Sequence, residues 1–209
     1  MDNEWLFQKA LQRLEQAWGD QGAPIVDALA PGATADQLDD VEGTLGFALP
    51  PEVRAWWGWH DGAVHPNGDG WTGDQTRIGP GFWDFLSSAS ALRERQARRD
   101  SWKSAHPDAD DGPDEDWDGL WRASWLPLLR ADADLLFVDC KQTTPAGTVP
   151  IRNHAHVPED VFTPASGSLF QAIEIWIWLL EERHVAWDHN QQGWEYENVP
   201  RPIQLSGLL

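Results

Sequence analysis

Three groups of residues have types and spacing that could support chemistry. His154 and His156 are two apart, so both side chains would lie on one face of a strand, where a pair of metal ligands could sit. Cys140 is the only cysteine and the one candidate for a thiol nucleophile. The segment 67–74 contains Asn-Gly-Asp-Gly and a later Asp, which resembles part of a calcium loop.

Each of these patterns is incomplete. No Cys or further His stands at ligand spacing near the histidine pair, so we expect surface histidines. Cys140 ends an apolar run and no Gly-x-Ser-x-Gly elbow occurs, which favours an inert buried thiol. The calcium-like segment lacks the full acidic spacing and the closing Glu, so we expect a turn. The sequence therefore predicts a protein that is not an enzyme, with no catalytic residues, no metal site and no cofactor.

Charge excludes two further classes of partner. The 209 residues carry 34 acidic and 15 basic side chains, a formal net charge of −19 at pH 7. Binding to a nucleic-acid backbone needs a surplus of Lys and Arg, and an anionic membrane would repel this chain. With 41% hydrophobic residues and 15 Trp the chain is too apolar for a disordered acidic tail, so we expect it to fold.

The compartment is predicted from the cysteine content and the N-terminus. A single unpaired thiol is easiest to keep in a reducing environment. Residues 1–4 lack the basic start and apolar run of a secretory signal. The most apolar stretch, 173–180, is much shorter than the roughly 20 residues of a membrane span. We expect a cytoplasmic protein without a transmembrane helix.

Apolar spacing predicts helices in the first half of the chain. One helix covers 4–18, and a short one ends near Leu29. Thr34 and Gln37 form a capping-box pattern for a third helix that ends at Gly46, and a fourth begins at Pro51. Segments 82–86 and from 92 onward are also expected to be helical.

The second half contains strands. Apolar runs at 125–129 and 135–139 flank a polar turn, and residues of the second run alternate between two faces that both need cover, so helices should pack on both sides. A third strand near 148–152 contains Pro150, which favours an edge or bulged position. A last helix at 169–182 is capped by Ser166 or Ser168. Helices, then strands, then a helix indicate the α+β class.

The segment 106–119 differs in composition from its surroundings, because it is strongly acidic and contains two prolines. We expect it to be either a solvated insertion or a partner contact. Trp18, Trp56 and Trp176 lie on apolar stripes and are expected in the core. Trp71, Trp117, Trp121, Trp187 and Trp194 have polar surroundings, which favours anchors for a protein partner or for sugar rings. The candidate partner-binding residues are Trp71, Asp74, Asp110, Asp111, Asp114, Glu115, Asp116, Trp117 and Asp118.

Three segments, in this order, resemble the SUKH superfamily of fungal cell-wall-synthesis regulators and bacterial toxin-immunity proteins. The first is PGATADQLDDVE at 31–42 with LGFALP at 45–50, WW at 56–57 and HDG at 60–62. The second is PGFWDFLS at 80–87, and the third is WLP at 125–127 with LFVD at 136–139, GTV at 147–149 and SLF at 168–170.

The resemblance implies a single domain at 1–183, with the acidic insertion near 106–119 and a tail at 184–209 packed on or extending it. It implies a mixed, mainly antiparallel sheet flanked by helices, and a role in protein binding. The implied partner is a cognate bacterial toxin, and a nuclease with a basic cleft would be attracted by the acidic surface. The alternative is a regulatory adaptor or carbohydrate-binding module related to the cell-wall regulators.

Overall fold

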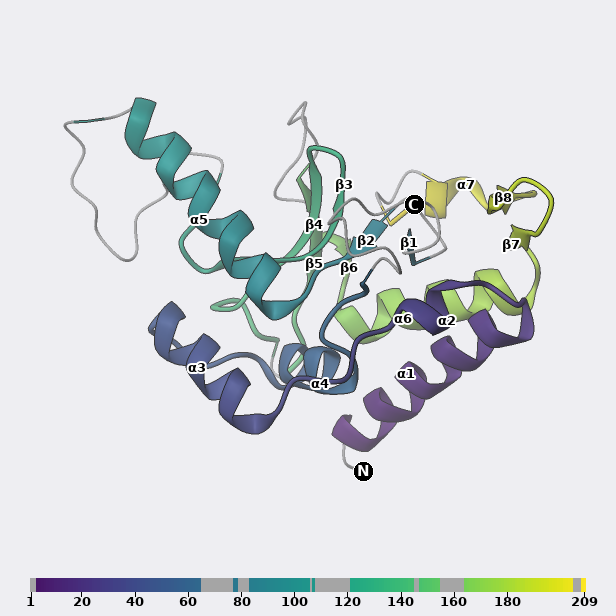
Figure 1. Cartoon of the computed structure of the whole chain (residues 1–209), viewed down its shortest axis with the longest axis horizontal. Coiled ribbons are helices and arrows are strands. Elements are labelled where there is room, and N and C mark those ends of the chain that lie inside the picture. Colours follow the sequence, from purple (N-terminus) through teal and green to yellow (C-terminus); the bar gives the residue numbers. More distant parts are fainter. Residues whose placement is uncertain are drawn as a thin grey trace.

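The first part of the chain is helical (Figure 1). The structure, a computed structural model, describes residues 3–64, 77–78, 83–105, 107, 121–144, 147–154, 164–204 and 208–209. The N-terminal helices are α1 (Asn3–Asp20), α2 (Ile25–Ala28), α3 (Ala35–Leu45) and α4 (Pro51–Trp59).

The ends of these helices follow the local sequence signals. The Thr34 side chain accepts a hydrogen bond from the Gln37 backbone N–H, and the Gln37 side chain accepts one from the Thr34 N–H, so the expected capping box is present. Gly46 ends α3 in the left-handed conformation, with a φ of 77°, and its N–H donates to the Glu42 carbonyl. Pro51 occupies the first turn of α4, as predicted.

The middle of the chain forms an antiparallel sheet in which neighbours in sequence are neighbours in space. The strands are β1 (Arg77–Ile78), β2 (Trp83–Phe85), β3 (Trp125–Ala131), β4 (Asp134–Asp139), β5 (Ile151–His154) and β6 (Pro164–Ser166). Helix α5 (Ser88–Ala105) connects β2 to β3. Every strand pair in the described sheet is antiparallel. The predicted α+β class is confirmed.

The chain ends with α6 (Leu169–Glu181), the hairpin of β7 (Val185–Asp188) and β8 (Gly193–Tyr196), and α7 (Arg201–Gln204). Of the two predicted caps for α6, Ser168 is the one used, since its side chain accepts from the Gln171 N–H. Residues of this tail, among them Trp187 and Leu208, belong to the main hydrophobic core. The predicted domain boundary at residue 183 stays a prediction.

The two faces of the sheet bury different clusters. Leu136 and Val138 of β4 join the main core with α1, α4 and α6, whereas Phe137 joins a second cluster with Trp121 and Trp125. Helix α5 lies against this second face, where the Arg98 guanidinium carbon is 4.9 Å from the centre of the Trp121 ring. Helices therefore pack on both faces, as the alternation in β4 predicts.

One local prediction is wrong and another holds in part. Residues 83–85 of segment 82–86 form strand β2 rather than helix, because Asp84 and Phe85 pair with Arg130 and Leu129 of β3. The third strand begins at Ile151, and Pro150 precedes it, so the proline removes no ladder hydrogen bond. Strand β5 is not an edge strand, since it pairs with both β4 and β6, but its register with β6 shifts between Ile151 and Arg152, next to the proline.

Candidate functional site: a groove between α1, α3 and α4

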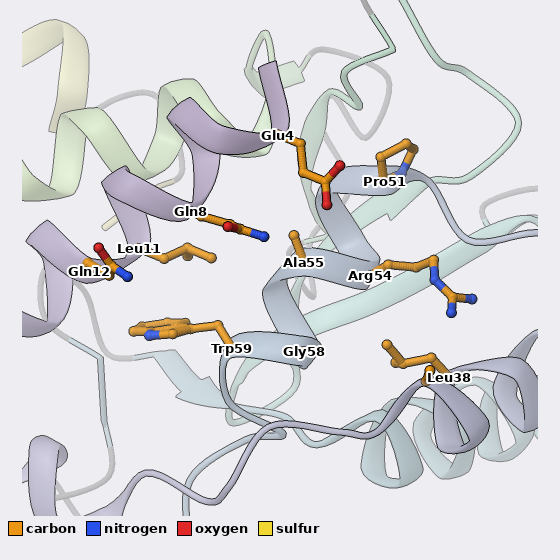
Figure 2. Close-up of a pocket in the computed structure, with 11 residues that line it drawn as sticks. Glu4, Gln8, Leu11, Gln12, Leu38, Pro51, Arg54, Ala55, Gly58 and Trp59 are labelled. Carbon is orange, nitrogen blue, oxygen red and sulfur yellow. The ribbon is translucent and has the colours of Figure 1, made fainter. Parts of the chain in front are cut away.

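A cavity of about 530 Å³ opens between three helices of the N-terminal part (Figure 2). We call it the α1–α4 groove. Its lining residues are Glu4, Gln8, Leu11, Gln12, Ala35, Leu38, Pro51, Arg54, Ala55, Gly58 and Trp59.

Polar side chains of α1 form one wall of the groove. Glu4, Gln8 and Gln12 recur every four residues, so they share one face of the helix, and Figure 2 shows them beside the groove. Leu11 lies next to this polar face and is buried. The wall therefore offers a carboxylate and two amide groups, which together accept several hydrogen bonds.

Small residues form the floor. Ala55 and Gly58 come from α4, and Ala35 comes from the start of α3. A Cβ at Gly58 would meet no heavy atom within 4 Å, and Gly58 lies within a regular helix. By contrast, a Cβ at Gly32 would collide with the Gly58 carbonyl oxygen, so close packing explains Gly32 but not Gly58. The glycine at position 58 leaves the α4 backbone open to the groove.

One end of the groove is closed by a fixed aromatic ring. The Trp59 indole Nε1 donates to the Glu15 carboxylate at 3.2 Å, and the ring stacks on Trp18 with 6.0 Å between centroids. His60 Nδ1 lies 2.7 Å from the Ala30 carbonyl oxygen, so Nδ1 is the protonated ring nitrogen. Glu15 Oε2 lies 3.5 Å from His60 Nε2. These contacts hold Trp59 in one orientation.

The other end carries Arg54, whose charge is neutralised by α3. Its guanidinium lies 2.9 Å from the Asp39 carboxylate and 2.7 Å from that of Glu42. Hydrogen bonds to Glu42 and then Asp39 raise the pKa of Arg54 above its ordinary value. Glu42 also accepts from the Leu49 backbone N–H at 2.9 Å. Figure 2 shows the Arg54 head group on the side away from Gln8 and Gln12.

Helix α3, beside the groove, is acidic. It contains Asp36, Asp39, Asp40 and Glu42 and no basic residue. Only Ala35 and Leu38 of this helix line the groove, and Asp39 and Glu42 pair with Arg54. The groove thus has one polar wall, a floor of small residues and an acidic helix beside it.

The comparison with protein families identifies the chain. The sequence pattern of the SMI1 / KNR4 family (SUKH-1) matches residues 32–166, more than half of the chain. The chain belongs to this family. The matched region holds α3, α4, α5 and strands β1 to β6, so it includes two of the three helices around the groove. The comparison with curated proteins gave no match.

The structure does not test the predicted partner-binding residues. Trp71, Asp74, Asp110, Asp111, Asp114, Glu115, Asp116, Trp117 and Asp118 all lie outside the described residues. Most of the acidic insertion near 106–119 lies outside them as well. The assignment of these residues to a partner contact stays a prediction.

Three of the tryptophans that we expected as exposed anchors are buried. Trp121 lies in the second cluster, with its ring 5.5 Å from that of Trp125. Trp187 and Trp194 pair across β7 and β8 and pack into the main core. The polar sequence neighbours of Trp187 and Trp194 are misleading, because successive residues of β7 and β8 face opposite sides of the hairpin and the two rings face the core. The three expected core residues, Trp18, Trp56 and Trp176, are buried as predicted.

Two other groups with possible chemistry have structural roles. Cys140 is buried, and burial together with the nearby Asp139 raises the pKa of its thiol to about 12. His154 is buried on β5 rather than on the surface, and its ring lies 5.5 Å from that of Trp121; His156 is outside the described residues. In the part of the chain that the structure describes, no three His, Cys, Asp or Glu residues cluster as metal ligands.

The groove itself is absent from the sequence-based prediction. Two signals pointed to it: the polar residues at 4, 8 and 12 beside the apolar stripe of α1, and a glycine inside the helix that follows Pro51. Neither signal reveals which helix lies opposite. Among the residues that the structure describes, no helix combines the length and the hydropathy of a membrane span.

Proposed function

We propose that this protein is an immunity protein, which binds a cognate toxin protein in the cytoplasm and holds it inactive without catalysing a reaction. The SUKH family includes such immunity proteins as well as the SMI1/KNR4 regulators. The observation that carries the proposal is the net charge of −19 on a member of this family. A surface of this charge attracts a basic protein from a distance and accelerates its association.

Nucleases are the toxin class that fits this charge best. A nuclease binds phosphates through a cleft lined with Lys and Arg. An acidic protein docked over that cleft would exclude the nucleic acid by shape and by repulsion. The inhibitor then needs affinity for the toxin and no chemical step of its own.

Complex formation is the direct test of the binding part. The purified chain and the polypeptide encoded by the adjacent gene are mixed and run on gel filtration, and their association rate is measured from 50 to 500 mM salt. We expect a stable complex whose association rate falls steeply as salt rises, because exposed charges are screened over about 8 Å at physiological ionic strength. A complex that forms at the same rate at all salt concentrations would contradict the electrostatic mechanism, and no complex would contradict the proposed function.

The same assay tests whether the acidic insertion near 106–119 contacts the toxin. Neutralising Asp110, Asp111, Asp114 and Asp116 together to Asn slows association if the insertion touches the toxin. If the rate stays the same, the insertion is only a solvated segment. Stability should change little in either case, since exposed charges contribute little to it.

A further inference from the structure

We propose that the α1–α4 groove is a docking surface for an arginine-bearing segment of the protein partner. The inference rests on the proposed function and names the surface that such binding uses. Three features of the molecule support it: the room in the groove, the chemistry of its wall, and the charge of the whole chain.

The groove has room for more than one side chain. Its volume of about 530 Å³ falls within the roughly 300–1,000 Å³ of typical ligand pockets. Gly58 widens it at the floor, although Gly within a helix is less stable than Ala. No packing constraint requires this glycine, since its Cβ would point into open space. A partner segment can therefore approach the α4 backbone closely.

The wall of the groove accepts hydrogen bonds at several points. No hydrogen bond joins the side chain of Glu4 or Gln8 to another described residue, whereas Gln12 Oε1 accepts from Lys9 at 3.3 Å, so the side-chain oxygens of Glu4 and Gln8 are available to a ligand. A guanidinium group has five N–H donors in a rigid plane, and it stacks on aromatic faces. Trp59 at the closed end offers such a ring. A carboxylate, two amides and an indole suit arginine better than the compact, strongly hydrated ammonium of lysine.

The charges at the groove and on the whole chain determine which class of partner segment can bind there. Arg54 is the one cation among the residues that line the groove, and it is held at one end by two carboxylates. Helix α3, beside the groove, carries two further acids, Asp36 and Asp40, and no basic residue. A second copy of the chain would bring another −19 charges and would be repelled, as would a nucleic acid. A basic protein segment is attracted.

Two glycines provide a matched pair of variants. Gly58→Trp fills the groove from its floor. Gly43→Trp places the same side chain on α3 outside the lining residues. Both glycines lie in helices, and for both a Cβ would meet no heavy atom within 4 Å, so both variants should fold. Thermal unfolding followed by circular dichroism verifies this.

The probe is a fluorescein-labelled nonapeptide of alternating Arg and Ala, compared with the same peptide carrying Gln for Arg, at about 50 mM salt. We expect the wild-type chain and Gly43→Trp to bind the arginine peptide with equal affinity and to prefer it over the glutamine peptide. Gly58→Trp should bind it at least tenfold more weakly. Glu4→Gln should weaken binding about threefold. Glu182→Gln, which changes an exposed carboxylate after α6 and outside the groove, should leave the affinity unchanged.

Two results overturn the inference. One is an affinity of Gly58→Trp for the arginine peptide within twofold of the wild type, and the other is equal binding of the two peptides by the wild-type chain. Neither bears on the proposed function, which is tested with the adjacent-gene polypeptide. A chain that binds that polypeptide but tolerates Gly58→Trp uses another surface, whereas a groove that binds arginine in a chain with no toxin partner has another function.

Discussion

Glu52 in α4 accepts a hydrogen bond from the backbone N–H of Val149, 97 residues later, with 2.9 Å between Oε2 and the nitrogen. The carboxylate is buried, and it ties the helix that floors the groove to the segment that leads into β5. The Leu169 N–H, at the start of α6, donates to the carbonyl of the same Val149 at 3.0 Å. Glu52 and Val149 together thus join α4, the segment before β5 and the start of α6.

Stability should depend on pH through Glu52. Burial raises the pKa of Glu52 above its ordinary value, because desolvation outweighs the favourable backbone hydrogen bonds. The folded protein therefore keeps a proton that the unfolded chain releases. The free energy of unfolding contributed by Glu52 is largest below the unfolded pKa and falls as pH rises through the folded pKa.

Glu52→Gln removes this dependence while keeping the shape and an accepting oxygen. Urea unfolding of both proteins between pH 4 and 7.5 should give a difference in stability that shifts toward the variant as pH rises. A difference that is constant over this range would contradict the raised pKa. Glu52→Ala should instead cost about 1–3 kcal/mol at every pH, because it leaves the buried Val149 N–H without an acceptor.

Asp139 should be important for the stability of the second face of the sheet. Its carboxylate accepts from the Ser124 hydroxyl at 2.8 Å, the Trp125 indole at 3.2 Å and the Lys141 N–H at 3.1 Å. Asp139→Ala should lower the free energy of unfolding by about 2–3 kcal/mol, since several buried donors lose their acceptor. Glu182→Ala, at an exposed position, is the control and should stay within about 0.5 kcal/mol of the wild type. An equal effect of the two substitutions would show that the buried carboxylate is not stabilising.

Cys140 should resist thiol reagents until the protein unfolds. With a thiol pKa of about 12, the folded protein holds much less thiolate at pH 8 than a free cysteine with a pKa of about 8.5. We expect iodoacetamide to react about a thousandfold more slowly with the native protein than with the protein in 6 M guanidinium chloride. Equal rates would mean that the thiol is accessible and ionised in the fold.

Gly58→Ala should stabilise the protein. Because the added methyl group meets open space within a helix, the gain should be about 0.5–1 kcal/mol. For a chain of this size that raises the melting temperature by about 1–4 °C. The corresponding change at the close-packed Gly32 should destabilise, since its Cβ would collide with the Gly58 carbonyl. A loss of stability in Gly58→Ala would mean that the groove floor is tighter than described.

Local signals in the sequence predicted most of the elements but not their partners. The Thr34 and Gln37 cap, Pro51 at the start of α4 and the apolar run of β4 act within a few residues, so the sequence alone reveals them. Strand β2 is too short for periodicity to identify, and its pairing with β3 decides its conformation.

The candidate site depends on longer-range packing. Glu4 and Trp59 lie on helices that meet only in the folded chain, so no spacing along the sequence predicts that they line one groove. The burial of Trp121 and Trp194 was missed for the same reason, because the cover comes from distant elements: Arg98 of α5 lies over the Trp121 ring, and the Trp194 indole donates to the Arg77 carbonyl of β1.

Growth of cells that express the adjacent-gene polypeptide tests the central claim most directly. That polypeptide is induced alone, with the wild-type chain, with Gly43→Trp or with Gly58→Trp. The account predicts that the polypeptide alone stops growth, that the wild type and Gly43→Trp restore it, and that Gly58→Trp restores it poorly. A toxic neighbour that the wild-type chain leaves fully active, or a neighbour that is harmless alone, would contradict the immunity function.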